Sequence, residues 1–221
     1  MAKAFDLASY KKTIEVNNVA KKKDKYVVVD ECLQEVIGIP GIPLGHIVQV
    51  YGKSDTGKTS LLFHAAAKAQ EQGVLPVFIM TEGKVDWTRA EKMGVNLENC
   101  VKNEECMYLE EAFTFIDKIV SDVAMGELPH DVLILWDSVG SVPCKMTYDG
   151  KGGKQHNASV LADKIGMGIN QRISGSRRTD KPYTNTLIIV NQPWVELPDN
   201  PFGQPKIKAK GGEAIWLNSS I

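Results

Sequence analysis

The sequence predicts an α/β fold, in which a mostly parallel β-sheet is flanked by helices and preceded by a short N-terminal arm. Three observations support this prediction. Short apolar runs of strand type recur along the chain, and they alternate with segments of helical periodicity. These runs are predominantly apolar, as expected for strands that are buried on both faces of a parallel sheet. A glycine-rich loop at residues 52–59 joins one such strand to a helix.

The individual elements follow from the same patterns in chain order. Strands are expected at residues 46–51, 76–80, 131–137 and 187–190, and a further strand is expected to begin near Glu213 and run to Leu217. Helices are expected at residues 60–70, 109–123 and 159–173. The apolar residues of the second helix share one face and are Ala112, Phe113, Ile116, Ile119, Val120 and Val123.

The first residues differ in character from the rest. We assign residues 1–30 to an arm that packs against another subunit, and residues 31–221 to the core. Within the arm, Phe5 to Val16 can form a short helix, and Tyr26 to Val29 is rich in strand formers. The lysine run from Lys21 to Lys25 fits a solvated linker better than a phosphate contact.

Composition excludes several classes of protein. The formal net charge of the 221 residues is −1, so nucleic-acid binding would depend on local basic patches. No long apolar stretch indicates a signal peptide or a membrane span, which favours a cytoplasmic protein. The cysteines lack the C-x-x-C spacing of zinc sites and are expected to be reduced; they are Cys32, Cys100, Cys106 and Cys144.

Residues 52–59 form a complete G-x-x-x-x-G-K-T phosphate loop. Gly52 and Gly57 allow the backbone to curl around phosphates, Lys58 reaches the β and γ phosphates, and the Thr59 hydroxyl binds Mg²⁺. A chance glycine-rich turn is the alternative, but the strand before the loop and the helix after it favour an anion site. The predicted nucleotide-binding residues are Gly52, Lys53, Ser54, Asp55, Thr56, Gly57, Lys58, Thr59 and Ser60.

Polar side chains follow three of the predicted strands, where ligands of parallel sheets are bound. Asp137 can hold Mg²⁺, or it can be a turn aspartate. Glu82 can deprotonate an attacking water, or it can be a surface glutamate. Gln192, after Asn191, can sense a γ-phosphate, although structural amides are common at such positions.

These segments, in this order, resemble the RecA recombinase family. The approach to the phosphate loop, residues 41–52, is similar to that of the family almost residue by residue. The other segments that carry the resemblance are residues 82–86, 92–95, 137–139, 191–192, 202–205 and 211–212. The resemblance implies a RecA-like P-loop ATPase core and extends from about Val28 to the end of the chain.

The resemblance also implies roles for individual residues. Glu82 would be the water-activating base, Lys58 and Thr59 would hold ATP and Mg²⁺, and Gln192 would couple the nucleotide state to DNA. Asp86 would contact the adenine edge. Arg89 stands where the family usually has an aromatic ring that stacks on adenine; a guanidinium also stacks on bases, and Trp87 is close in sequence.

Two segments are candidates for DNA contact. Between Pro193 and Gly211 the sequence has little secondary-structure signal, and its aromatic rings and alternating lysines suit a loop that binds single-stranded DNA. A surface loop without function is the alternative. Residues 148–156 stand where the family has its first DNA loop. The candidate DNA-binding residues are Lys164, Arg172, Trp194, Phe202, Lys206, Lys208, Lys210, Gly211 and Gly212.

The resulting hypothesis is an ATP-dependent DNA recombinase that forms filaments on single-stranded DNA and pairs that strand with homologous duplex DNA. Another motor with the same core, such as a hexameric helicase, is the first alternative. A non-catalytic recombination mediator is the second. The family continues the sheet beyond residue 215, so the sequence is expected to lack the family's C-terminal part and the basic residues it supplies to a neighbouring ATP site.

Overall fold

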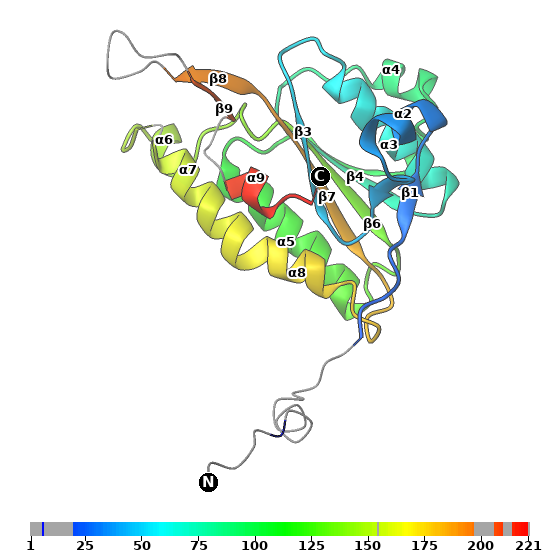
Figure 1. Cartoon of the computed structure of the whole chain (residues 1–221). Coiled ribbons are helices and arrows are strands. Elements are labelled where there is room, and N and C mark those ends of the chain that lie inside the picture. Colours follow the sequence, from blue (N-terminus) through cyan, green and yellow to red (C-terminus); the bar gives the residue numbers. More distant parts are fainter. Residues whose placement is uncertain (1–5, 7–19, 154, 197–205, 210–213, 221) are drawn as a thin grey trace.

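The computed structural model describes residues 6, 20–153, 155–196, 206–209 and 214–220 (Figure 1). Its centre is a five-stranded, entirely parallel sheet with the strand order β3-β7-β6-β4-β5. The strands are β3 (Ile47–Tyr51), β4 (Leu75–Met80), β5 (Val101–Asn103), β6 (Val132–Asp137) and β7 (Asn185–Asn191). The predicted α/β fold and four predicted strands are confirmed, whereas the short edge strand β5 was not predicted.

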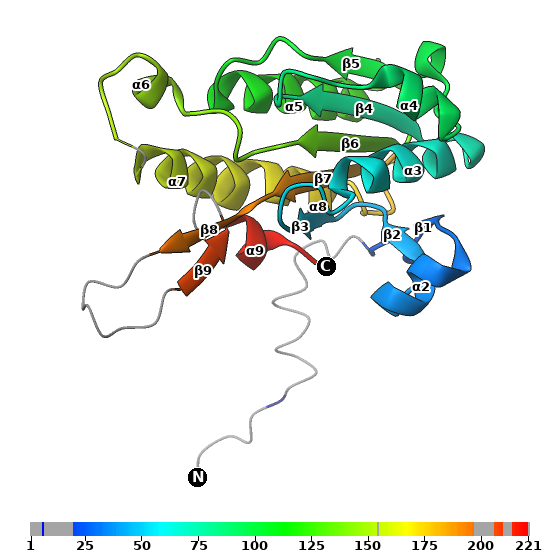
Figure 2. The same cartoon turned by 90° about the horizontal axis from the view of Figure 1, so that it is seen from above.

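Helices cover both faces of the sheet (Figure 2). One face carries α3 (Lys58–Glu71) and α4 (Trp87–Lys92). The other face carries α5 (Leu109–Met125), a continuous helical rod and the short α9 (Ala214–Asn218). The rod consists of α7 (Gln155–Leu161), a π-helical stretch (Ala162–Ile169) and α8 (Asn170–Gly175), so the helix predicted at 159–173 is longer than expected.

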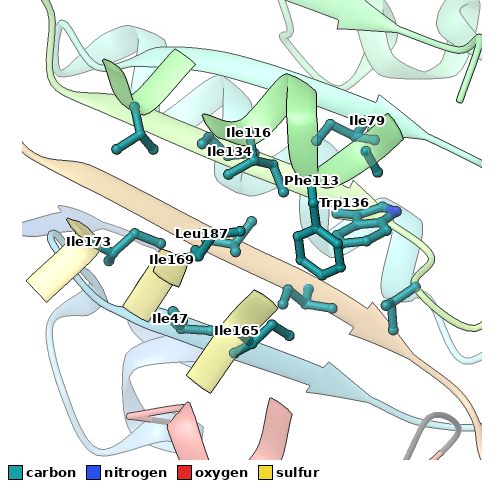
Figure 3. Close-up of a cluster of buried hydrophobic side chains, with 14 of the residues drawn as sticks. Ile47, Ile79, Phe113, Ile116, Ile134, Trp136, Ile165, Ile169, Ile173 and Leu187 are labelled. Carbon is teal, nitrogen blue, oxygen red and sulfur yellow. The ribbon is translucent and has the colours of Figure 1, made fainter. Parts of the chain in front are cut away.

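The apolar run Val132 to Trp136 of β6 is explained by burial on both sides. Its Val132, Ile134 and Trp136 pack into the core beneath α5, whereas Leu133 and Leu135 pack into the core beneath α3. The Phe113 ring meets the Trp136 ring edge to face, with centroids 5.2 Å apart (Figure 3). Every residue of the predicted apolar face of α5 is buried, which confirms that face.

A small unit at the start of the described chain packs beside the main sheet. Strand β1 (Tyr26–Val28) pairs antiparallel with β2 (Gly41–Pro43), and α2 (Glu31–Ile37) lies between them in the sequence. Gly41 is required because a Cβ there would overlap the Val27 carbonyl oxygen. The helix predicted from Phe5 to Val16 lies outside the described residues.

The lysine run is not simply a solvated linker. The Lys22 amide donates to the Arg177 carbonyl at 2.7 Å, and the Thr179 amide donates to the Ala20 carbonyl at 2.9 Å. The Lys22 ammonium also reaches the Ser176 carbonyl at 3.4 Å. The exposed side chains of Lys21, Lys23 and Lys25 agree with the predicted solvation, whereas the backbone contacts were not predicted because their partners lie far away in the sequence, after α8.

Two predictions near the end of the chain were also wrong. The strand expected from Glu213 to Leu217 is instead helix α9, in which Ile215 is buried while Trp216 and Leu217 are 68% and 66% exposed. A short apolar run cannot by itself distinguish a strand from one helical turn. The segment after Pro193 was expected to lack regular structure, yet β8 (Pro193–Glu196) pairs antiparallel with β9 (Lys206–Ala209).

Candidate nucleotide site

The glycine-rich loop leaves β3 and enters α3 at Lys58. Gly57, the residue before the helix, has a φ of 86°, in the left-handed region that glycine adopts without strain. Gly52 lies so close to the loop that a Cβ there would be 2.9 Å from the Thr56 hydroxyl. The two glycines therefore hold the backbone in the tight curl that their spacing predicts.

The Lys53 carbonyl oxygen organises the interior of the loop. It accepts a hydrogen bond from the Lys58 ammonium at 2.6 Å and another from the Thr56 hydroxyl at 2.8 Å. No sequence pattern indicated this acceptor, because it is a backbone group. The contact keeps the Lys58 cation over the loop, where phosphates would compete for it.

Thr59 and Asp137 meet although they are far apart in the sequence. The Thr59 hydroxyl donates to Asp137 Oδ2 at 2.5 Å, and Asp137 is 3% exposed at the carboxyl end of β6. Burial raises the pKa of the Asp137 carboxyl above its ordinary value, while the hydrogen bond from Thr59 opposes that rise. Hydroxyl and carboxylate oxygens are the ligands that Mg²⁺ prefers, so this pair has suitable chemistry for the cation.

Glu82, Ser138 and Gln192 form a second polar group beside the first. Glu82 Oε1 accepts a hydrogen bond from the Ser138 hydroxyl at 2.7 Å and one from the Gln192 amide nitrogen at 3.0 Å. These residues follow β4, β6 and β7, whose carboxyl ends lie at one edge of the parallel sheet. The Ser138 contact was not predicted, although its position directly after Asp137 was a usable signal.

The residues predicted to lie near adenine differ in their positions, because only Arg89 lines the cavity. The Arg89 guanidinium donates to the Ser60 hydroxyl at 2.6 Å and lines the cavity over the loop. Asp86 caps helix α4 by accepting from the Arg89 amide at 2.9 Å. Trp87 is half-buried and packs against the core residues Phe63 and Phe78, with ring centroids 6.2 Å and 5.3 Å away.

A cavity of about 410 Å³ joins these groups, a volume typical of small-ligand sites. Its lining combines the loop, the Thr59–Asp137 pair, the Glu82–Gln192 pair and the two cations Lys58 and Arg89. The donor set fits a nucleoside triphosphate with Mg²⁺, because cations and loop amides face anionic phosphates while a hydroxyl and a carboxylate offer hard oxygen ligands. Among the described residues, no three His, Cys, Asp or Glu side chains form another metal-binding group.

The predicted DNA-binding residues are spread more widely. Lys164 is exposed on the π-helical stretch, and Arg172 on α8 forms an ion pair with Asp117 at 3.0 Å. In the hairpin, Trp194 of β8 stands opposite Lys208 of β9, and Lys206 stands opposite Glu196. The remaining candidates lie outside the described residues and are Phe202, Lys210, Gly211 and Gly212.

Comparison with known proteins decides the family. The family model described as the RecA N-terminal domain matches residues 10–221, nearly the whole chain. The chain belongs to the RecA family. This membership agrees with the parallel sheet and with the position of the phosphate loop between β3 and α3.

Individual relatives of the RecA family are similar over most of the chain. Protein RecA of Wolbachia sp. subsp. Brugia malayi (strain TRS) is 28% identical over 204 residues, which cover 92% of this chain and 54% of that protein. Protein RecA of Fusobacterium nucleatum subsp. nucleatum is 30% identical over 189 residues, 86% of this chain and 46% of that protein. The mitochondrial DNA repair protein recA homolog 3 of Arabidopsis thaliana is 29% identical over 191 residues, 86% of this chain and 41% of that protein. The chain thus spans about half the length of the curated relatives it matches.

None of the described helices is both long and apolar enough to cross a membrane.

Proposed function

We propose that this RecA-family chain binds ATP with Mg²⁺ at the phosphate loop, hydrolyses it, and acts as a DNA recombinase. The observation that carries the proposal is the meeting of the Thr59–Asp137 pair and the Glu82–Gln192 pair in one cavity. The first pair is suited to hold the cation, and the second is suited to act on the terminal phosphate. Relatives named Protein RecA support the biological role, because their similarity covers most of this chain.

The chemistry follows from groups of this chain. Mg²⁺, when bound, neutralises phosphate charge and orients the phosphates. Lys58 leaves the Lys53 carbonyl to bind the β and γ phosphates. Glu82 accepts a proton from the attacking water, while the hydrogen bond from the Ser138 hydroxyl to Oε1 holds its carboxylate in position. We assign the proton to Oε2 for that reason.

Gln192 links this step to the predicted DNA loop. Its amide nitrogen bonds Glu82, and β8 begins with the next residue, Pro193. A γ-phosphate that accepts a hydrogen bond from the Gln192 amide would draw it from Glu82 and pull on the start of the hairpin. ATP binding and the position of the hairpin are then coupled through one side chain.

Further residues of the chain are assigned to contacts with adenine, with DNA and with a neighbouring subunit. Arg89 stacks on the adenine from the rim of the cavity, and Asp86 contacts the adenine edge from the N-cap position of α4. Single-stranded DNA binds along the hairpin and the segment that joins its strands, with Lys164 as a further phosphate contact, whereas Arg172 lies toward the amino end of β7, away from the hairpin. Residues 1–30 serve as the arm that joins subunits into a filament.

Electron microscopy tests this function against its alternatives. With single-stranded DNA and a non-hydrolysable ATP analogue, we expect helical filaments, and we expect none for Lys58→Ala because that variant loses the cation for the β and γ phosphates. Closed rings would indicate a hexameric motor instead. DNA-bound particles that form equally well without nucleotide would indicate a mediator.

A further inference from the structure

A second cavity, of about 420 Å³, lies at the amino-terminal end of strand β7, whereas the phosphate loop lies at the carboxyl-terminal ends of the strands. Residues at the ends of α5 and α8 line it, together with residues of the loop from Arg178 to Tyr183. The first residue of β7, Asn185, also lines the cavity. Because the strands are all parallel, this cavity and the candidate nucleotide site lie at opposite ends of the strands.

Three cations line this second cavity. Arg172 donates to Asp117 through Nη1 at 3.0 Å, and Arg178 forms an exposed pair with Asp180 at 2.9 Å. Lys181 forms no ion pair within the part of the chain that the structure describes. Exposed ion pairs hold their partners weakly, so an arriving phosphate can compete for these guanidinium groups and bind Lys181 directly.

Asn185 adds a hydrogen-bond acceptor to the cavity, in contrast to the three cations. The residue is 2% exposed, and its backbone amide donates to the Ser176 hydroxyl at 3.0 Å. Its side-chain oxygen Oδ1, in contrast, is buried without a hydrogen-bond partner among the described residues. A buried acceptor without a donor is unfavourable, and a ligand that brings an N–H group into the cavity would satisfy it. A phosphate alone cannot do so, because it is itself an acceptor.

The rest of the wall is apolar and includes an aromatic ring. Val120 and Val123 of α5 line the cavity together with Pro182 and Tyr183 of the loop. Such a wall suits a planar ring. The ligand must therefore combine an anionic group, a planar ring and an N–H donor.

We propose that this second cavity binds a nucleotide unit, with its phosphate on Lys181 and the arginines and its base amino group on Asn185 Oδ1. The unit can come from a free mononucleotide or from a DNA strand, since both present the same chemistry. The site is separate from the phosphate loop, so its existence does not depend on ATP binding there.

Calorimetric titration of the whole chain with dAMP tests the proposal. The Lys58→Ala background is used so that binding at the phosphate loop is weakened. We expect Lys181→Ala to reduce the affinity for dAMP about tenfold or more through loss of a charged contact. Lys92→Ala, which removes an exposed lysine of α4, is the matched control and should leave the affinity unchanged.

Asn185→Leu separates a ligand role from a structural role. The leucine side chain is similar in size and needs no donor, so the urea midpoint should stay the same or rise while the affinity for dAMP falls about tenfold. Weak binding of inorganic phosphate, titrated separately, should not change in this variant. A lower urea midpoint would show that Oδ1 has a structural partner, such as a bound water, and would overturn the assignment.

A short DNA duplex identifies the source of the nucleotide. If Lys181→Ala also weakens duplex binding, the cavity takes a unit of DNA; if duplex binding is unchanged, it takes a free mononucleotide. Undetectable dAMP binding at millimolar concentration, or equal affinity in the parent, Lys181→Ala and Asn185→Leu, would refute the proposal. Loss of ATP binding in Lys58→Ala has no bearing on either result.

Discussion

Replacement of Glu82 by glutamine changes the proposed base while preserving its surroundings. In the parent, Glu82 Oε1 accepts hydrogen bonds from the Ser138 hydroxyl at 2.7 Å and from the Gln192 amide nitrogen at 3.0 Å. The glutamine side chain would keep an oxygen that can accept the same two hydrogen bonds. The side chain should therefore stay in place and lose only its ability to accept a proton. General bases contribute about 10²–10⁴-fold to rates, so we expect turnover to fall at least about a hundredfold.

The affinity for ATP should change little in Glu82→Gln, because Lys58 and the Thr59–Asp137 pair are untouched. The assay is phosphate release in the presence of single-stranded DNA, with ATP binding measured separately by titration. Glu98→Gln, at an exposed position on the 3-10 turn Leu97–Asn99, is the matched control and should hydrolyse ATP like the parent. Parental turnover in Glu82→Gln would refute the assignment of the base.

Three further predictions concern DNA binding, pH and the core. Replacing Lys206, Lys208 and Lys210 by alanine should flatten the log–log salt dependence of single-stranded DNA binding by about two units, since each contact contributes roughly 0.7; an unchanged slope would remove this segment from the DNA site. Burial lowers the pKa of His46, and the nearby Arg177 guanidinium lowers it further. The His46 Nε2 atom accepts a hydrogen bond from Arg177 at 2.6 Å, and its Nδ1 atom lies 2.6 Å from the Ser220 hydroxyl. The neutral ring is thus favoured in the folded state, so the free energy of unfolding should be highest above a pH of about 6.5 and decrease below it; urea titrations should show a smaller decrease for His46→Gln, and an equal decrease would contradict the pKa direction. Phe113→Ala should lower the free energy of unfolding by about 3–5 kcal/mol, because it leaves a cavity against the fully buried Trp136; a loss below about 1 kcal/mol in urea would show that the core collapses around the site.

Much of the fold was predictable because its signals are local. The apolar run of β6 and the apolar face of α5 each required only neighbouring residues, and both were placed correctly. Segments with weak local patterns were not. Helix α9 was mistaken for a strand because the burial of Ile215, which distinguishes it from the exposed Trp216, depends on packing against distant elements.

In the candidate site, too, the features that depend on neighbouring residues were predictable, and those that depend on packing were not. The spacing of Gly52, Gly57 and Lys58 predicts a phosphate loop without any structure, and the polar residues at the ends of β4, β6 and β7 were noticed because each follows an apolar run. Sequence could not show that the Trp87 ring packs against the core or that the Lys53 carbonyl accepts a hydrogen bond from Lys58. Those facts depend on distances across the fold.

Helical and strand periodicity and glycine spacing are properties of neighbouring residues, so sequence alone was enough to predict the fold class, the glycine-rich loop between β3 and α3 and the polar side chains at the strand ends. Only the tertiary structure decided which of these groups meet. Thr59 and Asp137 are brought within 2.5 Å, and Glu82 and Gln192 within 3.0 Å, by parallel strands that align their carboxyl ends. The second cavity around Asn185 was decided in the same way, because it arises where the ends of two helices and a loop close over the opposite edge of the sheet.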